Sequence, residues 1–125
     1  MFARHLVESA TLTDDALELS VRLNWYRSLP LSCVEQLGVR LDGEALAPAT
    51  LEVDGVRYGV ADLAAADDRW WHVLDSALVR VPLERTPGAG RHEVEFVLGS
   101  RIPYLVAPDG SAAVIADSAR AEVAR

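Results

Sequence analysis

Apolar and polar residues alternate along much of the chain, the pattern of β-strands with one buried side and one solvent-facing side. The clearest example covers residues 17–25, where the apolar positions are Leu17, Leu19, Val21, Leu23 and Trp25. The positions between them are Glu18, Ser20, Arg22 and Asn24. Because the second face is polar throughout, we expect a strand in a sheet that has one solvated side.

Further short strands are predicted at residues 34–41, 51–53, 56–58, 76–83, 92–98, 102–107 and 113–115. Two of them have clear inward faces, which we expect to be Ala77, Val79 and Val81 in one and Val94, Phe96 and Leu98 in the other. Pro103 cannot donate a ladder hydrogen bond, so we expect it at a strand margin or at a sheet edge.

Turn signals separate these strands. Asp42-Gly43 and Asp54-Gly55 are typical of two-residue hairpin turns, and Asp109-Gly110 is expected to turn a further hairpin. Residues 86–90 form a loop by composition, and residues 62–66 form at most one helical turn. The polar, alanine-rich segment 118–125 is predicted to be frayed or a short helix.

About seven short strands and no long helix indicate an all-β fold. We predict a single antiparallel β-sandwich, immunoglobulin-like in its general plan, that occupies residues 1–125 as one domain. Neither an internal repeat nor a shift in composition divides the chain.

Charge and composition narrow the classes of function. The net charge of −7 argues against nucleic acid and against anionic membrane surfaces as partners. No apolar run approaches the length of a membrane span, and the first nine residues lack the apolar region of a signal peptide, so we expect a cytoplasmic protein. Cys33, the single cysteine, is expected to be a small buried hydrophobic residue.

Catalytic motifs are not evident. The chain has neither a glycine-rich phosphate loop nor a G-x-S-x-G motif, and His5, His72 and His92 lack the spacing of metal ligands. The adjacent acids Asp67 and Asp68 are typical of a solvated turn. We therefore expect no catalytic residue, no metal and no cofactor in this chain.

Aromatic residues and arginine cluster in two places, the loop at residues 25–31 and the segment 68–71. This composition is typical of protein–protein interfaces. Neighbouring residues on a strand face opposite ways, so Trp70 and Trp71 cannot both lie in one core. The predicted partner surface comprises Tyr26, Arg27, Leu29, Pro30, Leu31, Arg69, Trp70, Trp71, Arg101 and Tyr104. In an alternative interpretation, Leu29 and Leu31 plug one end of the sandwich and Arg27 forms an internal salt bridge.

The same segments carry a family resemblance. Residues 26–32, Tyr-Arg-Ser-Leu-Pro-Leu-Ser, followed by a strand that closes on Asp42-Gly43, resemble the beta subunit of C-glycoside deglycosidases. Residues 52–58 are similar to a hairpin of that family, and residues 67–70 to its acidic-Arg-Trp segment. Segments at 87–94 and 101–105 follow in the family's order, so the resemblance covers about residues 15–106 and leaves residues 107–125 unassigned.

The resemblance implies a non-catalytic β-sandwich subunit. Its partner would be a larger, TIM-barrel-like alpha subunit that holds manganese or another divalent metal and the catalytic base. The assembly would be a dimer of heterodimers or a larger hetero-oligomer. The complex would cleave the carbon–carbon bond between a 3-oxo sugar and an aromatic aglycone. The resemblance therefore implies that this chain is a non-catalytic subunit of a carbon–carbon lyase.

Two rival interpretations predict different structures. A stand-alone carbohydrate- or ligand-binding module would present flat, coplanar, solvent-open tryptophans for stacking on sugar. A stand-alone enzyme would assemble a metal site from His5, His72 or His92 and carboxylates. A third possibility is that the same pair of subunits acts on a substrate other than a C-glycoside.

Overall fold

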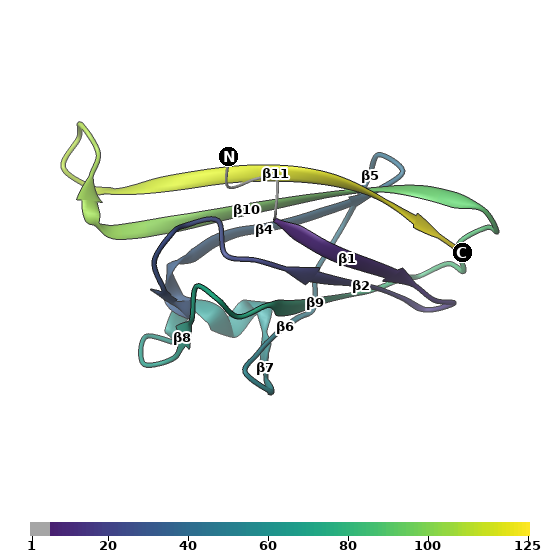
Figure 1. Ribbon diagram of the computed structural model, residues 1–125, viewed down its shortest axis with the longest axis horizontal. Helices are drawn as coiled ribbons and strands as arrows, with labels where there is room; N and C mark the ends of the chain where they lie inside the picture. Colours follow the sequence, from purple (N-terminus) through teal and green to yellow (C-terminus); the bar gives the residue numbers. More distant parts are fainter. Residues whose placement is uncertain (1–5) are drawn as a thin grey trace.

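Two antiparallel sheets face each other in the computed structural model, which describes residues 6–125 (Figure 1). The five-stranded sheet has the order β1 (Val7–Leu12), β2 (Ala16–Val21), β9 (Ala77–Pro82), β6 (Thr50–Val53) and β7 (Val56–Gly59). The four-stranded sheet has the order β11 (Ala112–Ala124), β10 (Arg91–Val106), β4 (Val34–Leu41) and β5 (Glu44–Leu46). The prediction of an all-β antiparallel sandwich is confirmed.

The smaller elements lie at one end of the sandwich. β3 (Leu29–Pro30) and β8 (Trp70–Trp71) form a separate two-stranded pair. Two 3-10 helices, η2 (Leu31–Cys33) and η3 (Val60–Ala65), complete the described elements. A 3-10 helix has about three residues per turn, so the six residues of η3 exceed the single helical turn expected there. The estimate of about seven strands was low because several strands have only two to four residues.

Side chains from both sheets make one hydrophobic core. The predicted inward faces are confirmed, since Leu17, Leu19, Val21, Ala77, Val79, Val81, Val94, Phe96 and Leu98 are all buried. The Asp-Gly hairpins are confirmed as well. Asp42 and Gly43 have φ of 50° and 83°, and Asp54 and Gly55 have 53° and 76°, as a two-residue turn of this type requires.

β10 and β11 differ most from expectation. The segments predicted as separate strands at 92–98 and 102–107 are one strand of 16 residues. The prediction of a frayed or helical end at 118–125 is wrong, because β11 pairs with β10 from Ala112 to Ala124. Ala119, Ala121 and Val123 are more buried than their neighbours, the alternation of a strand. The helix propensity of alanine is a weak preference that pairing along β10 overrides.

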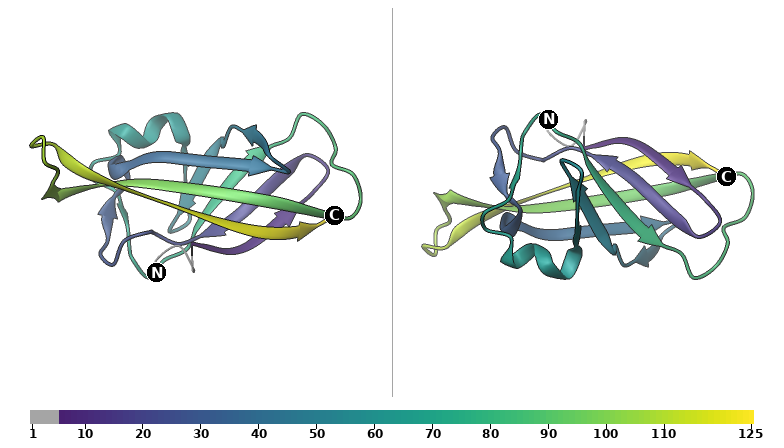
Figure 2. Two further views of the ribbon diagram at one scale, coloured as in Figure 1. Left: turned by 90° about the horizontal axis from the view of Figure 1, so that it is seen from above. Right: turned by 90° about the horizontal axis from the view of Figure 1, so that it is seen from below.

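The ends of β10 and β11 extend beyond the sandwich as a ribbon (Figures 1 and 2). We call residues 103–114 the arm. Its ladder is irregular, since Ile102 pairs with Ala113 and Val106 pairs with Ala112. Residues 103–105 have no opposite residue and form a bulge. Pro103 lies in this bulge, where its missing N–H removes no ladder hydrogen bond.

Candidate functional site

The loop between β2 and β3 is fixed to the four-stranded sheet by Asn24. Its side-chain amide donates to the carbonyl oxygens of Leu98 and Ile115, both at 3.0 Å, and to Asp117 Oδ2 at 3.2 Å. Asn24 Oδ1 accepts a 2.6 Å hydrogen bond from the Ser100 hydroxyl. Asn24 is fully buried, so its predicted position on the wet face is wrong. β2 ends at Val21, and the alternation therefore carries no information at residue 24.

Aromatic rings and Arg27 gather where this loop meets the arm. Trp25 Nε1 donates a 2.6 Å hydrogen bond to the Tyr104 hydroxyl. The Arg27 guanidinium lies 5.4 Å from the ring centre of Tyr26 and 5.9 Å from that of Tyr104. Both tyrosines are exposed. Cation–π contacts at these distances hold the guanidinium in place while its N–H groups stay accessible.

Ion pairing separates Arg27 and Arg69 from the other arginines of the described chain. Nine arginines pair with a carboxylate within the chain: Arg22, Arg40, Arg57, Arg80, Arg85, Arg91, Arg101, Arg120 and Arg125. Within residues 6–125, Arg27 and Arg69 have no carboxylate at ion-pair distance. Both belong to the predicted partner surface. Their side chains are exposed and free to meet an external acid.

The structure brings part of the predicted partner surface to the molecular surface. Tyr26, Arg27, Arg69, Trp70 and Tyr104 are exposed, and Pro30 and Arg101 are partly buried. β8 and the arm lie at the same end of the molecule (Figures 1 and 2). The prediction that only one of the adjacent tryptophans is buried is confirmed, because Trp70 is 48% exposed and Trp71 is 0% exposed.

Leu29, Leu31 and Trp71 are core residues, and their assignment to the surface is wrong. Leu29 pairs with Trp71 in the short ladder between β3 and β8. The Trp71 indole N–H donates to the backbone oxygen of Asp75 at 2.9 Å, which satisfies its polar atom inside the protein. The alternative, in which the leucines plug the end of the sandwich, describes these two side chains correctly.

Arg101 forms the internal salt bridge that was considered for Arg27. Its guanidinium pairs with Glu35 and donates to the backbone oxygen of Ser32 at 3.2 Å. These contacts tie β10 to the start of β4 and to η2. Arg101 therefore holds η2 and the start of β4 against β10.

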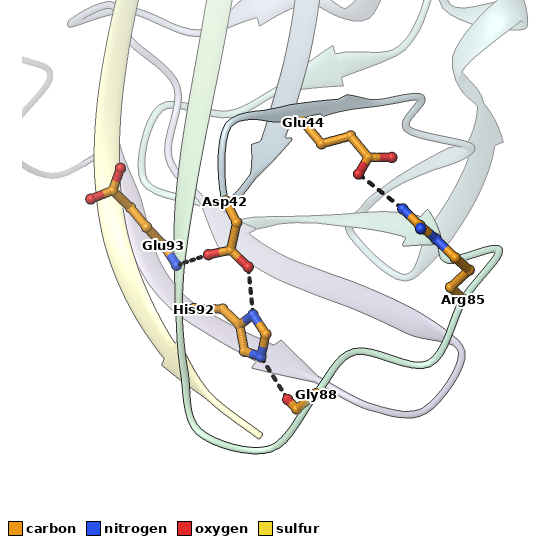
Figure 3. A network of polar contacts seen from close by, with 6 residues as sticks. All are labelled: Asp42, Glu44, Arg85, Gly88, His92 and Glu93. Carbon is orange, nitrogen blue, oxygen red and sulfur yellow. Dashed lines mark hydrogen bonds and ion pairs between the residues drawn. The ribbon is translucent and has the colours of Figure 1, made fainter.

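His92 forms a second polar network at the opposite end (Figure 3). Its Nδ1 lies 2.6 Å from Asp42 Oδ2, and its Nε2 lies 2.7 Å from the backbone oxygen of Gly88. Both partners are acceptors, so satisfying both ring nitrogens requires the protonated imidazolium. The hydrogen bond that His92 donates to the Asp42 carboxylate raises the pKa of His92, and the hydrogen bond to the Gly88 carbonyl adds to this shift. The same hydrogen bond lowers the pKa of Asp42, and the Glu93 N–H adds to that shift.

This network borders a hollow of about 830 Å³ between β5 and the loop that follows β9. Four of its charged side chains are paired with one another, since Arg85 pairs with Glu44 at 3.2 Å and His92 pairs with Asp42. The contacts bind the loop at residues 86–90 to the turn between β4 and β5. The role of this network is therefore structural, since it holds the loop in place.

The remaining candidate ligands do not converge. His72 follows β8, and His92 lies at the far end of the molecule, where β10 begins (Figure 1). His5 lies outside the described residues. Within residues 6–125, no group of three histidine, cysteine or acidic side chains is placed to hold a metal. Asp67 and Asp68 are exposed in a turn, as predicted, and Cys33 is buried, as predicted. No helix in the described range is long and apolar enough to cross a membrane.

Comparisons with known proteins agree with the motifs in the chain. The family model of the C-glycoside deglycosidase beta subunit matches residues 12–104. A 3'-dehydrocarminate deglycosidase beta subunit from Microbacterium sp is 42% identical over 82% of this chain and 79% of its own length. A C-glycoside deglycosidase beta subunit from Microbacterium trichothecenolyticum is 33% identical over 87% of this chain and 86% of its own length. Another, from Arthrobacter globiformis, is 36% identical over 75% of this chain and 74% of its own length. The chain thus belongs to the family of C-glycoside deglycosidase beta subunits.

Proposed function

We propose that this chain is the non-catalytic beta subunit of a heteromeric C-glycoside deglycosidase in the cytoplasm. The relatives are named as beta subunits, which implies a complex with another subunit. The proposed partner is a TIM-barrel-like alpha subunit, in a dimer of heterodimers or a larger assembly. The alpha subunit would hold the catalytic base and a divalent metal, either manganese or another one.

The proposed reaction is the elimination of an aromatic aglycone from a 3-oxo-C-glycoside. The oxidised C3 makes the proton on C2 acidic, and a base removes it to give an enolate. The enolate then expels the aglycone, so that the bond from C1 to the aglycone breaks and a C1–C2 double bond forms. The bonding electrons leave with the aglycone carbon, which takes up a proton. A divalent metal stabilises an enolate of this kind.

The observation that carries the role of this chain is the position of Arg27 and Arg69. They are the two arginines of residues 6–125 without an internal carboxylate, and they belong to the end of the sandwich that exposes Tyr26, Trp70 and Tyr104. Aromatic residues and arginine are enriched in interfaces and dominate their binding energy. This combination supports a docking surface for a partner with acidic side chains.

The rival sugar-binding interpretation receives less support. A stacking platform needs flat, coplanar and open tryptophans, but Trp71 is buried in the core. The rings of Trp25 and Tyr26 are tilted by 47° at a centroid distance of 4.9 Å. An interface accommodates such tilted rings readily, because a protein partner can be shaped around them.

Co-expression tests the proposal. The partner is sought among the neighbouring genes as one that encodes a metal-dependent, sugar-isomerase-like barrel, and it is expressed with and without this chain. We expect the two chains to co-elute in gel filtration, and we expect turnover of a 3-oxo-C-glycoside with manganese only when the barrel is present. Turnover by this chain alone, or failure of the two chains to associate, would contradict the proposal.

A further inference from the structure

The arm exposes an unusual amount of apolar surface. Tyr104 is 53% exposed, Leu105 40%, Val106 69% and Val114 53%. These four make up half of the eight exposed large hydrophobic residues in the part of the chain that the structure describes. Exposed apolar side chains that gather in one segment of a soluble protein are typical of an interaction site.

The projection of the arm beyond the sandwich accounts for this exposure (Figure 1), and the bulge adds to it at residues 103–105. Consecutive side chains of a regular strand point to opposite faces, yet Tyr104, Leu105 and Val106 are all exposed. Residues 103–105 have no opposite residue on β11, and a bulge of this kind redirects side chains. The tip is nevertheless ordered by its own contacts, because Ala107 N donates to Ser111 O at 2.7 Å and Asp109 Oδ1 accepts from the Ser111 N–H and hydroxyl.

We propose that the arm packs Leu105, Val106 and Val114 on an apolar surface of the alpha subunit, and that Arg27 at the base of the arm binds a carboxylate beside that surface. The inference rests on the proposed function, since it names the alpha subunit as the occupant. It extends that function to a second contact, which projects from the sandwich. The family model ends at residue 104, so the tip of the arm lies beyond the matched segment.

Charge favours a different chain as the occupant over a second copy of this one. The chain carries a net charge of −7, so two copies repel each other. Arg27 is a positive charge on this negatively charged chain, and no carboxylate of residues 6–125 forms an ion pair with it. Its guanidinium lies over the rings of Tyr26 and Tyr104. A guanidinium stacked on aromatic rings presents its N–H edge for a two-point contact with a carboxylate. The partner surface must therefore supply both an apolar area and an acid.

The first experiment compares matched valine substitutions in the binding of the purified alpha subunit. Val106→Thr with Val114→Thr keeps side-chain size and strand propensity but adds hydroxyl groups to the arm. Val56→Thr makes the same kind of substitution at one position on β7, where Val56 is 43% exposed. We expect at least a tenfold rise in Kd for the arm variant and less than a threefold change for Val56→Thr.

Hydrogen exchange of the wild-type proteins gives a second measurement that does not depend on how the variants fold. We expect backbone amides of the arm to exchange more slowly in the complex than in the free chain. Unchanged exchange in the arm, or unchanged affinity of the arm variant, would overturn the inference while the complex itself stands. An arm-dependent dimer of this chain alone would overturn it as well. If the wild-type chains do not associate at all, the proposed function fails instead.

Discussion

Two polar side chains, Asn24 and His92, hold loops of this protein in place, and each bonds at least one partner that is distant in the sequence. Asn24 joins the loop after β2 to β10 and β11, and His92 joins the loop before β10 to the turn after β4. Buried polar groups cost free energy unless they are hydrogen-bonded, so the buried amide of Asn24 needs all of its partners. The second lies at the surface and depends on protonation.

Asn24→Ala should lower the free energy of unfolding by at least about 2 kcal/mol, because several buried polar groups lose their partner at once. The carbonyls of Leu98 and Ile115 lose a donor, and the Ser100 hydroxyl loses its acceptor. Urea unfolding measures the change. Ser20→Ala on β2 is the control and should cost much less. Equal effects of the two substitutions would contradict a structural role for Asn24.

His92→Gln should destabilise the chain between about pH 4 and pH 6.5 and have little effect at pH 9. The pKa of His92 is raised from 6.5, so its contribution is complete below that pH and is lost as pH rises through the folded pKa. The pKa of Asp42 is lowered from 3.8, so its contribution is present above that pH and is lost as pH falls through the folded pKa.

Thermal melts of wild type and His92→Gln at pH 5.5 and pH 9 check this window. His72→Gln, which alters an exposed histidine, is the control and should change the melting temperature little at either pH. A difference in melting temperature that is the same at both pH values would mean that the charge on His92 is irrelevant.

At the scale of elements, local patterns predict strands well and predict what lies between them poorly. The alternating segments and the Asp-Gly turns specify β2, β9, the start of β10 and two hairpins, because strand periodicity and turn conformation are local properties. The burial of Leu29, Leu31 and Trp71 follows from the pairing of β3 with β8, which no local pattern shows. For the candidate site, the exposed Tyr26, Arg27 and Trp70 and the hairpin turn at Asp109-Gly110 could be predicted from the sequence. The burial of Asn24 and the length of β10 and β11, which carries the arm beyond the sandwich, could not.

Deleting residues 117–125 should abolish cooperative folding, although sequence composition suggests a dispensable tail. The deletion removes the partners of Arg91–Leu98 in β10 and the core residue Val123, and it leaves a long unpaired edge. Thermal melting followed by circular dichroism measures the effect. Arg125→Ala, which removes the ion pair with Asp14 and keeps the backbone hydrogen bonds between residue 125 and Gly90, should shift the midpoint only slightly. A melting curve like that of wild type for the longer deletion would contradict the importance of this end of β11.

At the scale of the whole molecule, the two ends of the sandwich differ. The end near the start of β10 carries internally paired charges around His92, Asp42, Glu44 and Arg85 (Figure 3). The opposite end carries β8, the arm and exposed aromatic residues (Figure 1). A surface whose charges are already paired has less to gain from a partner, so we expect assembly through the second end.

Arg27→Ala and Trp70→Ala should each weaken binding to the alpha subunit by about 2 kcal/mol or more, the usual cost at an interface hot spot. Both side chains are exposed, so the isolated variants should melt near the wild-type temperature. Isothermal titration calorimetry gives the affinity. Arg91→Ala is the matched control, since Arg91 lies at the other end and pairs with Glu122. If both variants bind as wild type does, or if both unfold, the interface assignment is wrong.

The pairing of early strands with late ones has a consequence for folding kinetics. Leu19 of β2 pairs with Val79 of β9, and Val39 of β4 pairs with Phe96 of β10, so each sheet joins distant parts of the chain. Folds dominated by such pairings form in about milliseconds to seconds, whereas a β-hairpin closes in about microseconds. The hairpin of β10 and β11 can therefore form before either sheet. An isolated hairpin is marginally stable in water, so this early hairpin opens and closes until the sheets form. Its apolar tip packs on neither sheet, so it is exposed to solvent and to other chains throughout the slower assembly of the sandwich.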